Sequence, residues 1–347
     1  MSILLEPASI RRILVIKLRA IGDVLLSTVV LDNLRRGFPG AEMHFLTEPA
    51  ASDLLKYHPA IDQVQIFDRS RMSGVDLIRT VRRQRYNLVV DLFGNPRTAL
   101  VTRLSGAAHR VGYRFRGRTY AYNHRVEPRG DRVHNTEFNL DALQALGLPI
   151  HTRVPRITLG PEERAWAVEF LNTAVPSGGP LVAINAGGGW YTKRWGGDRF
   201  ASLADLLVTR HDARILILWG PGERPDAEGI AGSMTNRGIL PPETSLLQLA
   251  GLLERCALLV TNDSGPMHIA AAMGTPVLAV FGPTNPLLQG PIGNNHRVVR
   301  CEGLNCLGCN LTSCPIGLPC MKDLSVESVY EEARTMLTGD EPALTVG

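Results

Sequence analysis

The turn at residues 262–266 carries the side chains in this chain that are best suited to bind an anion. The apolar run before it, 258–261, predicts a buried strand, and the alanine-rich run after it, 267–273, predicts a helix with Pro266 in its first turn. Because the first N–H groups of a helix have no partner inside it, they favour an anionic ligand such as a phosphate. The candidate binding residues of this turn and of the helix after it are Asp263, Ser264, Gly265 and His268.

The same residues also fit a plainer interpretation, in which Asp263 or Ser264 only caps the helix and His268 packs against the core. Neither this turn nor the first strand–helix turn, which holds the single glycine Gly22, has the three-glycine fingerprint of a dinucleotide site. The sequence therefore gives no support for NAD or FAD, and an oxidoreductase is the least favoured class of function.

Asp23 is the candidate catalytic group. Residues 12–18 (RILVIKL) predict a strand, 19–23 a loop and 24–36 a helix, so Asp23 is expected at the carboxyl end of the first strand. Ligands of open α/β sheets bind at that edge, where a carboxylate can act as a general base and take a proton from a sugar hydroxyl. Aspartate is also among the best helix N-caps, which is the structural alternative.

A glycine loop at 187–189 marks a second binding region. Glycines let the backbone approach a ligand closely, and Lys193 and Arg194 follow at a distance that suits a diphosphate. Glu223 comes after the predicted strand 214–218 and could bond a ribose hydroxyl, as acids do in other nucleotide folds. Two exposed cations and an ordinary loop acid are the plainer alternatives.

The elements that position these groups form two series of β–α repeats, which predict an α/β fold with two Rossmann-like domains. A Pro-to-Gly segment at 155–160 is the expected linker, so the predicted domains are 1–155 and 156–347. A helix at 325–337 closes the second series and could cross back to the first domain, and 340–347 is expected to be frayed. The expected strands are 12–18, 42–46, 63–67, 88–92, 110–113, 181–185, 214–218, 258–261 and 277–281.

Charge is distributed unevenly between the two predicted domains. Residues 1–155 hold 23 basic against 14 acidic residues, whereas the rest of the chain holds 14 against 19. A run of arginines between Arg110 and Arg132, interrupted by tyrosines, predicts a long loop that grips phosphate or carboxylate groups bidentately. An anionic acceptor or an anionic membrane face fits the basic half, a solvated basic surface is the alternative, and scarce aromatics argue against nucleic acid.

Two features of the sequence concern the location of the protein in the cell. No run of 18 or more apolar residues predicts a transmembrane helix, and the first 20 residues do not have the pattern of a signal peptide. We therefore expect a cytoplasmic protein, with peripheral contact at the inner face of the plasma membrane as an open addition.

Four segments occur in order along the chain: ILVIKLRAIGDVLLS near the start, KRW at 193–195, TNDSGPMHIAAAMGTPVLAVFGPT in the second half, and a cysteine-rich tail at 301–320. Together they resemble glycosyltransferase family 9, the ADP-heptose:lipopolysaccharide heptosyltransferases. The resemblance implies a GT-B fold, in which two Rossmann-like domains face each other across a cleft. It also implies inverting transfer of heptose from ADP-heptose to a lipopolysaccharide inner-core acceptor, without a metal or other cofactor.

The resemblance also implies roles for single residues. Asp23 matches the family's proposed base, Lys193 the lysine that contacts the donor phosphates, and Glu223 the acid near the adenosine ribose. Asp263, Ser264, Gly265 and His268 match the loop around the donor heptose and diphosphate. Gly187 and Gly188 are further donor candidates, as is Arg194, although some relatives carry hydroxyl groups at the glycine loop. The acceptor candidates are Arg19, Asn95, Arg97 and Arg114.

Three questions stay open at this point: which acceptor and which heptose position, which donor sugar, and which oligomeric state. A UDP-sugar transferase or epimerase of the same fold is the first alternative function. A nucleotide-sugar binding protein without catalysis is the second, and Asp23 argues against it.

Five of the six cysteines lie between Cys301 and Cys320, with intervals of four, two, four and five residues. Such a density could ligate zinc or an iron–sulfur cluster, but the spacing matches no established ligand motif. Reduced or partly paired cysteines are favoured over a structural metal. The residues concerned are Cys301, Cys306, Cys309, Cys314 and Cys320.

Overall fold

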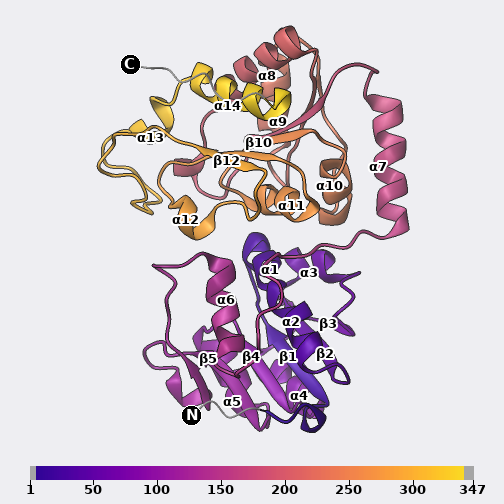
Figure 1. Ribbon diagram of the computed structural model, residues 1–347, viewed down its shortest axis with the longest axis vertical. Helices are drawn as coiled ribbons and strands as arrows, with labels where there is room; N and C mark the ends of the chain where they lie inside the picture. Colours follow the sequence, from indigo (N-terminus) through magenta and orange to yellow (C-terminus); the bar gives the residue numbers. More distant parts are fainter. Residues whose placement is uncertain (1–4, 340–347) are drawn as a thin grey trace. The chain divides into compact units, whose positions relative to one another are not determined.

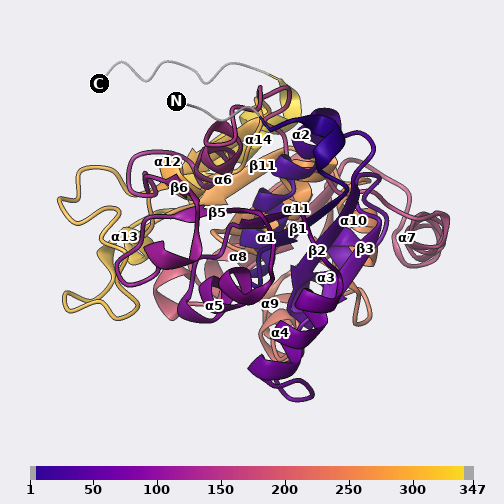
Figure 2. The same cartoon turned by 90° about the horizontal axis from the view of Figure 1, so that it is seen from below.

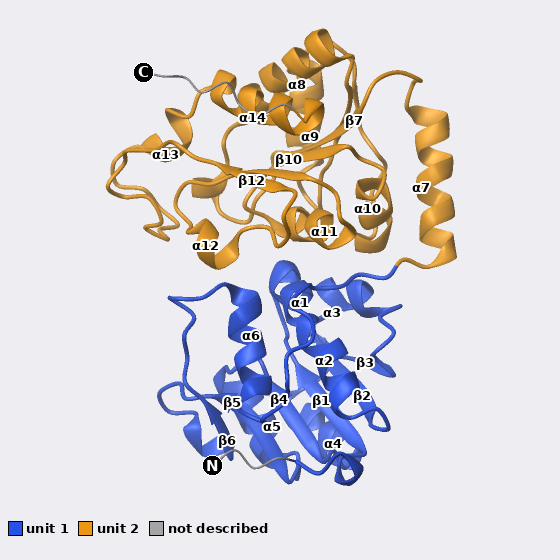
Figure 3. Cartoon of the chain, in the orientation of Figure 1, with its two compact units in different colours: residues 1–158 blue, residues 159–347 orange. Residues whose placement is uncertain are grey.

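The computed structural model describes residues 5–339, and the predicted frayed end at 340–347 lies outside the described part (Figure 1). The chain divides into two compact units, Met1–Thr158 and Leu159–Gly347 (Figure 3). In the part of the chain that is described, no helix combines the length and the apolar character needed to cross a membrane. Each unit is described by itself below.

Unit 1 contains a six-stranded sheet in the order β3-β2-β1-β4-β5-β6, and every pair of neighbours is parallel. Alternate residues of β1 point to opposite faces: Ile13 and Val15 pack with one core cluster, Leu14 and Ile16 with the other. The strand is apolar throughout because helices cover both faces. The strands are β1 Arg12–Ile16, β2 Glu42–Thr47, β3 Gln63–Ile66, β4 Leu88–Asp91, β5 His109–Tyr113 and β6 His124–Val126.

Helices of unit 1 form two layers around this sheet (Figures 1 and 2). The first layer holds α1, α2 and α6, whose apolar residues join the Val15 cluster, and the second holds α4 and α5, which join the Ile16 cluster. The α-helices are α1 Ile21–Ser27, α2 Val29–Gly37, α3 Pro49–Ser52, α4 Gly74–Arg83, α5 Pro96–Leu104 and α6 Asn135–Gln144. The short 3-10 helices are η1 Pro7–Ser9, η2 Asp53–Leu55 and η3 Thr119–Ala121.

Unit 2 repeats the same plan, with a parallel sheet in the order β12-β11-β10-β7-β8-β9. Numbered from its own first strand, this is the order of unit 1, and it is the doubly wound order in which ligands bind at the carboxyl ends of the strands. The strands are β7 Leu181–Asn185, β8 Arg214–Ile217, β9 Gly238–Ile239, β10 Leu258–Asn262, β11 Val277–Val280 and β12 His296–Val299.

Two helical layers also cover the sheet of unit 2. Helix α8 contacts both α9 and α14 over one face, and α10 contacts α7 and α11 over the other (Figure 1). The C-terminal helix α14 packs on α8 and on strands β10 and β12 of its own unit. The helices are α7 Pro161–Ala174, α8 Gly197–His211, α9 Arg224–Ser233, α10 Leu246–Leu253, α11 Gly265–Met273, α12 Pro286–Gln289, α13 Pro319–Lys322, α14 Val326–Thr338 and the 3-10 turn η4 Tyr191–Lys193.

The predicted α/β fold of two Rossmann-like domains is confirmed, but two local predictions were wrong. The helix expected at 24–36 begins at Ile21 and is interrupted at Thr28, whose hydroxyl donates to Leu25 O and accepts from Arg156 N–H. The expected long loop at 110–132 contains η3 and the edge strand β6.

Candidate functional site

Asp23 is the third residue of α1 and is held by two neutral donors. One carboxylate oxygen accepts from the backbone N–H of Ala20 at 3.2 Å, and the other accepts from Asn135 Nδ2 at 2.5 Å. Asn135 is the first residue of α6, which packs against α1. The carboxylate therefore bonds the residue before its own helix, as a capping acid does, but it is also oriented by a side chain 112 residues away.

Lys17 lies beside Asp23 at the carboxyl end of β1 and is only 7% exposed. Its Nζ donates to Leu92 O at 3.3 Å. Burial lowers the pKa of Lys17, and the nearby charges of Asp23 and Asp91 oppose that change. Neither Lys17 nor Asn135 was a sequence candidate, although a lysine inside the apolar run ILVIKL is an available signal.

Asp91 ends β4 and has a structural task at the same edge. It is fully buried and accepts from Gly94 N–H at 2.9 Å, from Phe93 N–H at 3.1 Å and from Tyr122 Oη at 2.8 Å. Burial raises its pKa and these hydrogen bonds oppose the rise. This network fixes the loop that leads into α5.

The four acceptor candidates lie in unit 1 but have different surroundings. Asn95 caps α5, because its side chain accepts from Thr98 N–H at 2.8 Å. The guanidinium of Arg97 lies over the Phe67 ring, 5.3 Å from its centroid. Arg19 and Arg114 are both exposed. Arg114 forms an ion pair with Glu127.

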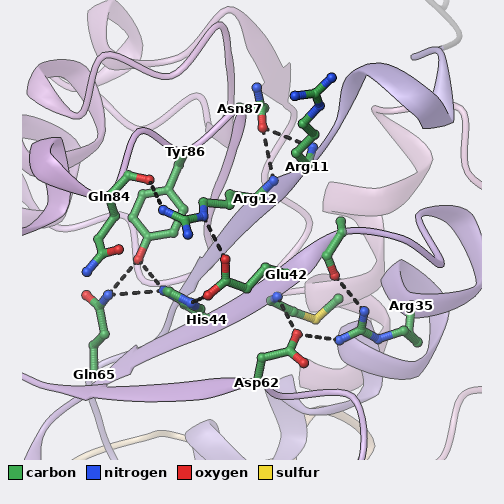
Figure 4. Close-up of polar contacts among 12 residues, drawn as sticks. Arg11, Arg12, Arg35, Glu42, His44, Asp62, Gln65, Gln84, Tyr86 and Asn87 are labelled. Atoms are coloured by element: carbon green, nitrogen blue, oxygen red, sulfur yellow. Dashed lines mark hydrogen bonds and ion pairs between the residues drawn. The ribbon is translucent and has the colours of Figure 1, made fainter.

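A Glu–His–Tyr arrangement in unit 1 has the appearance of a catalytic group but lies at the opposite edge of the sheet (Figure 4). His44 Nε2 lies 2.9 Å from Glu42 Oε1, and its Nδ1 lies 2.7 Å from Tyr86 Oη. Glu42 begins β2 and also pairs with Arg12, which begins β1. Because ligands of this fold bind at the carboxyl edge, we assign the network to stability rather than to the site.

In unit 2, Lys193 and Asp263 form an ion pair. Lys193 Nζ lies 2.7 Å from Asp263 Oδ2 and 4.6 Å from the centroid of the Trp190 ring. Thr284 Oγ1 donates to the same carboxylate oxygen at 2.7 Å. The carboxylate is almost fully buried, and its bonds connect the loops after β10 and β11 with the turn η4.

The glycine loop after β7 folds around Glu223. Gly188 N–H and Gly220 N–H donate to the two carboxylate oxygens at 3.3 and 3.1 Å. A Cβ at Gly187 would lie 2.5 Å from either oxygen, so a side chain there would displace the carboxylate. Arg194 donates from Nε to Gly188 O at 3.1 Å and pairs with Asp226. Gly187, Gly188, Arg194 and Glu223 thus belong to one cluster.

Ser264 precedes α11 but makes no capping hydrogen bond. Its hydroxyl instead accepts from Asn185 Nδ2 at 3.0 Å and lies 3.1 Å from Thr261 Oγ1. The backbone N–H groups at the start of α11, beginning with Gly265, therefore receive no bond from this side chain. His268 is buried one turn into the same helix.

Asn262, at the end of β10, was not a sequence candidate. Its Nδ2 donates to Ala186 O at 2.7 Å and to Gly187 O at 3.1 Å, and its Oδ1 accepts from Trp195 N–H at 3.1 Å. One amide therefore holds both ends of the loop that carries Lys193 and Arg194. An asparagine that ends a buried strand was the available signal.

The cysteine-rich segment supports the same loops through its backbone. Leu311 O accepts from Thr192 Oγ1 at 2.9 Å, and Asn310 N–H donates to Pro283 O at 2.6 Å. All six cysteines are free, and no group of metal-ligand side chains occurs among the described residues. Burial raises the pKa of Cys320 to about 11, and the thiols of Cys306, Cys309 and Cys314 contribute to that rise.

Two parallel six-stranded sheets of the same doubly wound order, each with polar groups at its carboxyl edge, define the GT-B class of fold. The family model for glycosyltransferase family 9 (heptosyltransferase) matches residues 75–318. The chain belongs to this family and is therefore a glycosyltransferase.

The comparisons with individual proteins agree. Lipopolysaccharide heptosyltransferase 1 of Pseudomonas aeruginosa is 28% identical over 310 residues, which cover 82% of each chain. A family 9 glycosyltransferase structure from Veillonella parvula is 24% identical with a TM-score of 0.83, covering 95% of this chain and 98% of that one. An Escherichia coli heptosyltransferase solved with ADP is 23% identical with a TM-score of 0.71, covering 94% and 99%. Other relatives are named lipopolysaccharide heptosyltransferase 2 and 3.

Proposed function

We propose that this enzyme transfers a heptose from ADP-heptose to the inner core of a lipopolysaccharide, with inversion at the anomeric carbon and without a metal. Membership of family 9 supports the class of reaction. The names of the relatives support the acceptor, and the ADP held by the Escherichia coli enzyme supports the nucleotide. Because relatives numbered 1, 2 and 3 are all similar to this chain, the position of the transferred heptose is left to experiment.

Asp23 acts in this proposal as the general base. Its carboxylate takes the proton of the acceptor hydroxyl as the hydroxyl oxygen attacks the anomeric carbon. Asn135 and the Ala20 N–H hold the carboxylate in place by hydrogen bonds, and the buried Lys17 lies within electrostatic range. All three groups act through Asp23 and are positioning groups.

Unit 2 holds the donor in this proposal. As the anomeric bond breaks, negative charge gathers on the leaving diphosphate. Lys193, Arg194 and the N–H groups at the start of α11, which the Ser264 side chain does not cap, are the donors available to stabilise it. Glu223, which accepts from two glycine N–H groups, also accepts from a ribose hydroxyl in this proposal.

The observation that carries the proposal is the Lys193–Asp263 pair beside the uncapped start of α11. Because the lysine is already ion-paired, a bound diphosphate would share or replace the carboxylate as its partner. Glycine-loop backbone and a cationic side chain therefore meet in one unit, which is what recognition of a sugar diphosphate needs.

The test is a transfer assay with ADP-heptose on a series of truncated lipopolysaccharide acceptors, read by mass spectrometry as the gain of one heptose. We expect transfer to one truncation only. In parallel, calorimetry compares ADP-heptose with a UDP-sugar, and we expect binding of the ADP-sugar alone. Preference for the UDP-sugar would favour the alternative transferase or epimerase, whereas binding without transfer to any acceptor would favour a non-catalytic protein.

A further inference from the structure

We propose that the outward face of α4 and α5 binds an anionic lipid bilayer. We call it the α4–α5 face, and it consists of Val75, Arg79, Arg82, Arg83, Leu100, Arg103 and Leu104. The two helices lie side by side on one face of the unit 1 sheet (Figures 1 and 2). Arg82 Nη1 donates to Leu104 O at 3.2 Å, so the surfaces of the two helices are continuous.

Aliphatic side chains on this face are not needed by the core. Leu77, Val81 and Val101 point inward and complete the cluster under the helices. Val75 is 56% exposed, Leu100 42% and Leu104 37%. Single exposed aliphatic residues are ordinary, but three on two adjacent helices among arginines are the composition of a surface that lies in a membrane interface.

Positive charge on the face is mostly uncompensated. The one acid in α4 and α5, Asp76, pairs with Arg79 at 3.2 Å. Arg82, Arg83 and Arg103 are exposed and form no ion pair with a described acid. The surrounding chain, 69–132, contains 15 arginines and four acids, so no neighbouring stretch supplies the missing negative charge. Anionic headgroups complement this charge, whereas exposed aliphatic rather than aromatic side chains do not favour single-stranded nucleic acid.

The direction of α5 relates this face to the proposed acceptor site. The helix begins beside the acceptor candidates Asn95 and Arg97 at the carboxyl edge of the sheet and ends at Leu104. Nine helical residues span roughly 13 Å. If the proposed function holds, the sugar of a lipid-anchored acceptor needs to extend only about this far from the headgroups. The surface itself is inferred without reference to the reaction.

The first experiment is flotation of the full chain with vesicles that contain no lipopolysaccharide. We expect the protein to bind phosphatidylcholine vesicles that contain about 30% phosphatidylglycerol, and about 0.5 M salt should release it. Vesicles of phosphatidylcholine alone should not bind it. Arg82→Glu/Arg83→Glu/Arg103→Glu should weaken binding by about a hundredfold or more. The matched control, Arg164→Glu/Arg237→Glu/Arg255→Glu, changes net charge equally at exposed positions of unit 2 and should bind almost as wild type.

The second experiment removes the apolar part. Val75→Ser/Leu100→Ser/Leu104→Ser should weaken binding at least tenfold while keeping its salt dependence. Thermal melts check that each variant folds, and Arg83→Glu/Arg103→Glu replaces the triple variant if loss of the Arg82 bond to α5 destabilises it. Three outcomes would each overturn the inference. The arginine variants could float as well as the wild type does, or the unit 2 control could lose as much binding as they do. The wild type could also bind neutral vesicles as well as anionic ones.

Turnover separates this inference from the proposed function. With a soluble, deacylated acceptor, the arginine variants should retain wild-type kcat, and with an acceptor embedded in anionic vesicles they should lose rate in proportion to binding. Flotation without any transfer activity would support the surface and count against the proposed function. Transfer without flotation would support the proposed function and count against the surface.

Discussion

Units 1 and 2 share one strand order but differ at the edge where the doubly wound fold binds ligands. At the edge of unit 1, the Asp23 carboxylate is held by neutral donors and lies within reach of a buried cation. At the edge of unit 2, the buried Asp263 carboxylate is ion-paired with Lys193, and a glycine loop bonds a second acid. The scaffold is thus common, and the chemistry depends on the loops and helix starts attached to it.

The comparison also explains why the two aspartates are expected to do different work. Asp263 is bonded by Lys193 and Thr284 through the same oxygen, Oδ2, which is therefore committed to holding loops. Asp23 is partly exposed, and it is held by two hydrogen bonds from neutral donors rather than by an ion pair. A base must accept a proton from a ligand, and the less committed carboxylate is suited to that.

The largest expected effect is that of Asp23→Ala. General bases contribute about 10²- to 10⁴-fold, so we expect kcat to fall by that factor while the dissociation constant of ADP-heptose changes less than about twofold. Steady-state kinetics and calorimetry measure the two quantities. Asp131→Ala, an exposed acid of the same unit, is the control. Near-normal turnover of Asp23→Ala would remove the base assignment and with it this contrast between the units.

Lys193→Ala is expected to act on the other side of the comparison. Loss of one charged hydrogen bond to the diphosphate should raise the dissociation constant of ADP-heptose about 10- to 100-fold, with a smaller effect on kcat. The substitution also leaves Asp263 buried without its cation, which should lower the melting temperature.

A double variant separates affinity from stability at this pair. Lys193→Ala/Asp263→Asn removes both charges and keeps an acceptor for Thr284. It should regain much of the melting temperature but none of the donor affinity. Recovery of donor affinity in the double variant would show that the lysine serves only to neutralise Asp263.

The sequence predicted the two β–α series because the central strands are continuous apolar runs between turn residues. It missed β6, β9 and β12, which are short strands at or next to the sheet edges and have two to four residues, often polar. A strand of that kind is specified by its neighbour in the sheet rather than by its own pattern. The break in the first helix was missed for a related reason, because the Thr28 hydroxyl bonds a residue 128 positions away.

For the candidate site, sequence reasoning found the residues that follow strands but not those that hold them. Asn135 reaches Asp23 from another helix, and Asn262 reaches the glycine loop from another strand. Asn135 lies 112 residues from Asp23 in the sequence, and Asn262 lies 75 residues from Gly187, so only the folded chain brings each pair together. The predicted roles of Asp23, Lys193 and Glu223 remain predictions that the kinetics above test.

A smaller effect is expected from Asn135→Ala, which sharpens the claim that Asp23 is supported by neutral donors. Loss of this hydrogen bond leaves the carboxylate less precisely oriented toward the acceptor hydroxyl, so kcat should fall while the dissociation constant of ADP-heptose stays unchanged. We expect kcat at neutral pH to fall about tenfold, less than in Asp23→Ala. Gln144→Ala, an exposed residue at the other end of α6, is the control. A lowered melting temperature with unchanged kcat would assign Asn135 to folding alone.

The smallest effect is expected for His58 in unit 1, and it concerns stability rather than transfer. It is 3% exposed, and burial lowers its pKa to about 4; Asp32 opposes this change and Arg156 adds to it. The ordinary pKa of histidine is about 6.5, so the folded state binds this proton less well than the unfolded state does. The stability that depends on neutral His58 is therefore fully present above pH 6.5 and is lost as pH falls toward 4.

The loss should reach at most about 3 kcal/mol, and it should be absent from unit 2. All four tryptophans lie in unit 2, so tryptophan fluorescence reports that unit, whereas far-ultraviolet circular dichroism reports both. Urea unfolding between pH 7.5 and 4.5 should show the wild type losing more stability than His58→Gln by circular dichroism, with no difference between them by fluorescence. Equal acid sensitivity of the two proteins by circular dichroism would show that His58 is not the group responsible. A difference seen by fluorescence as well would show that the two units unfold together, and that their separate edges belong to one cooperative structure.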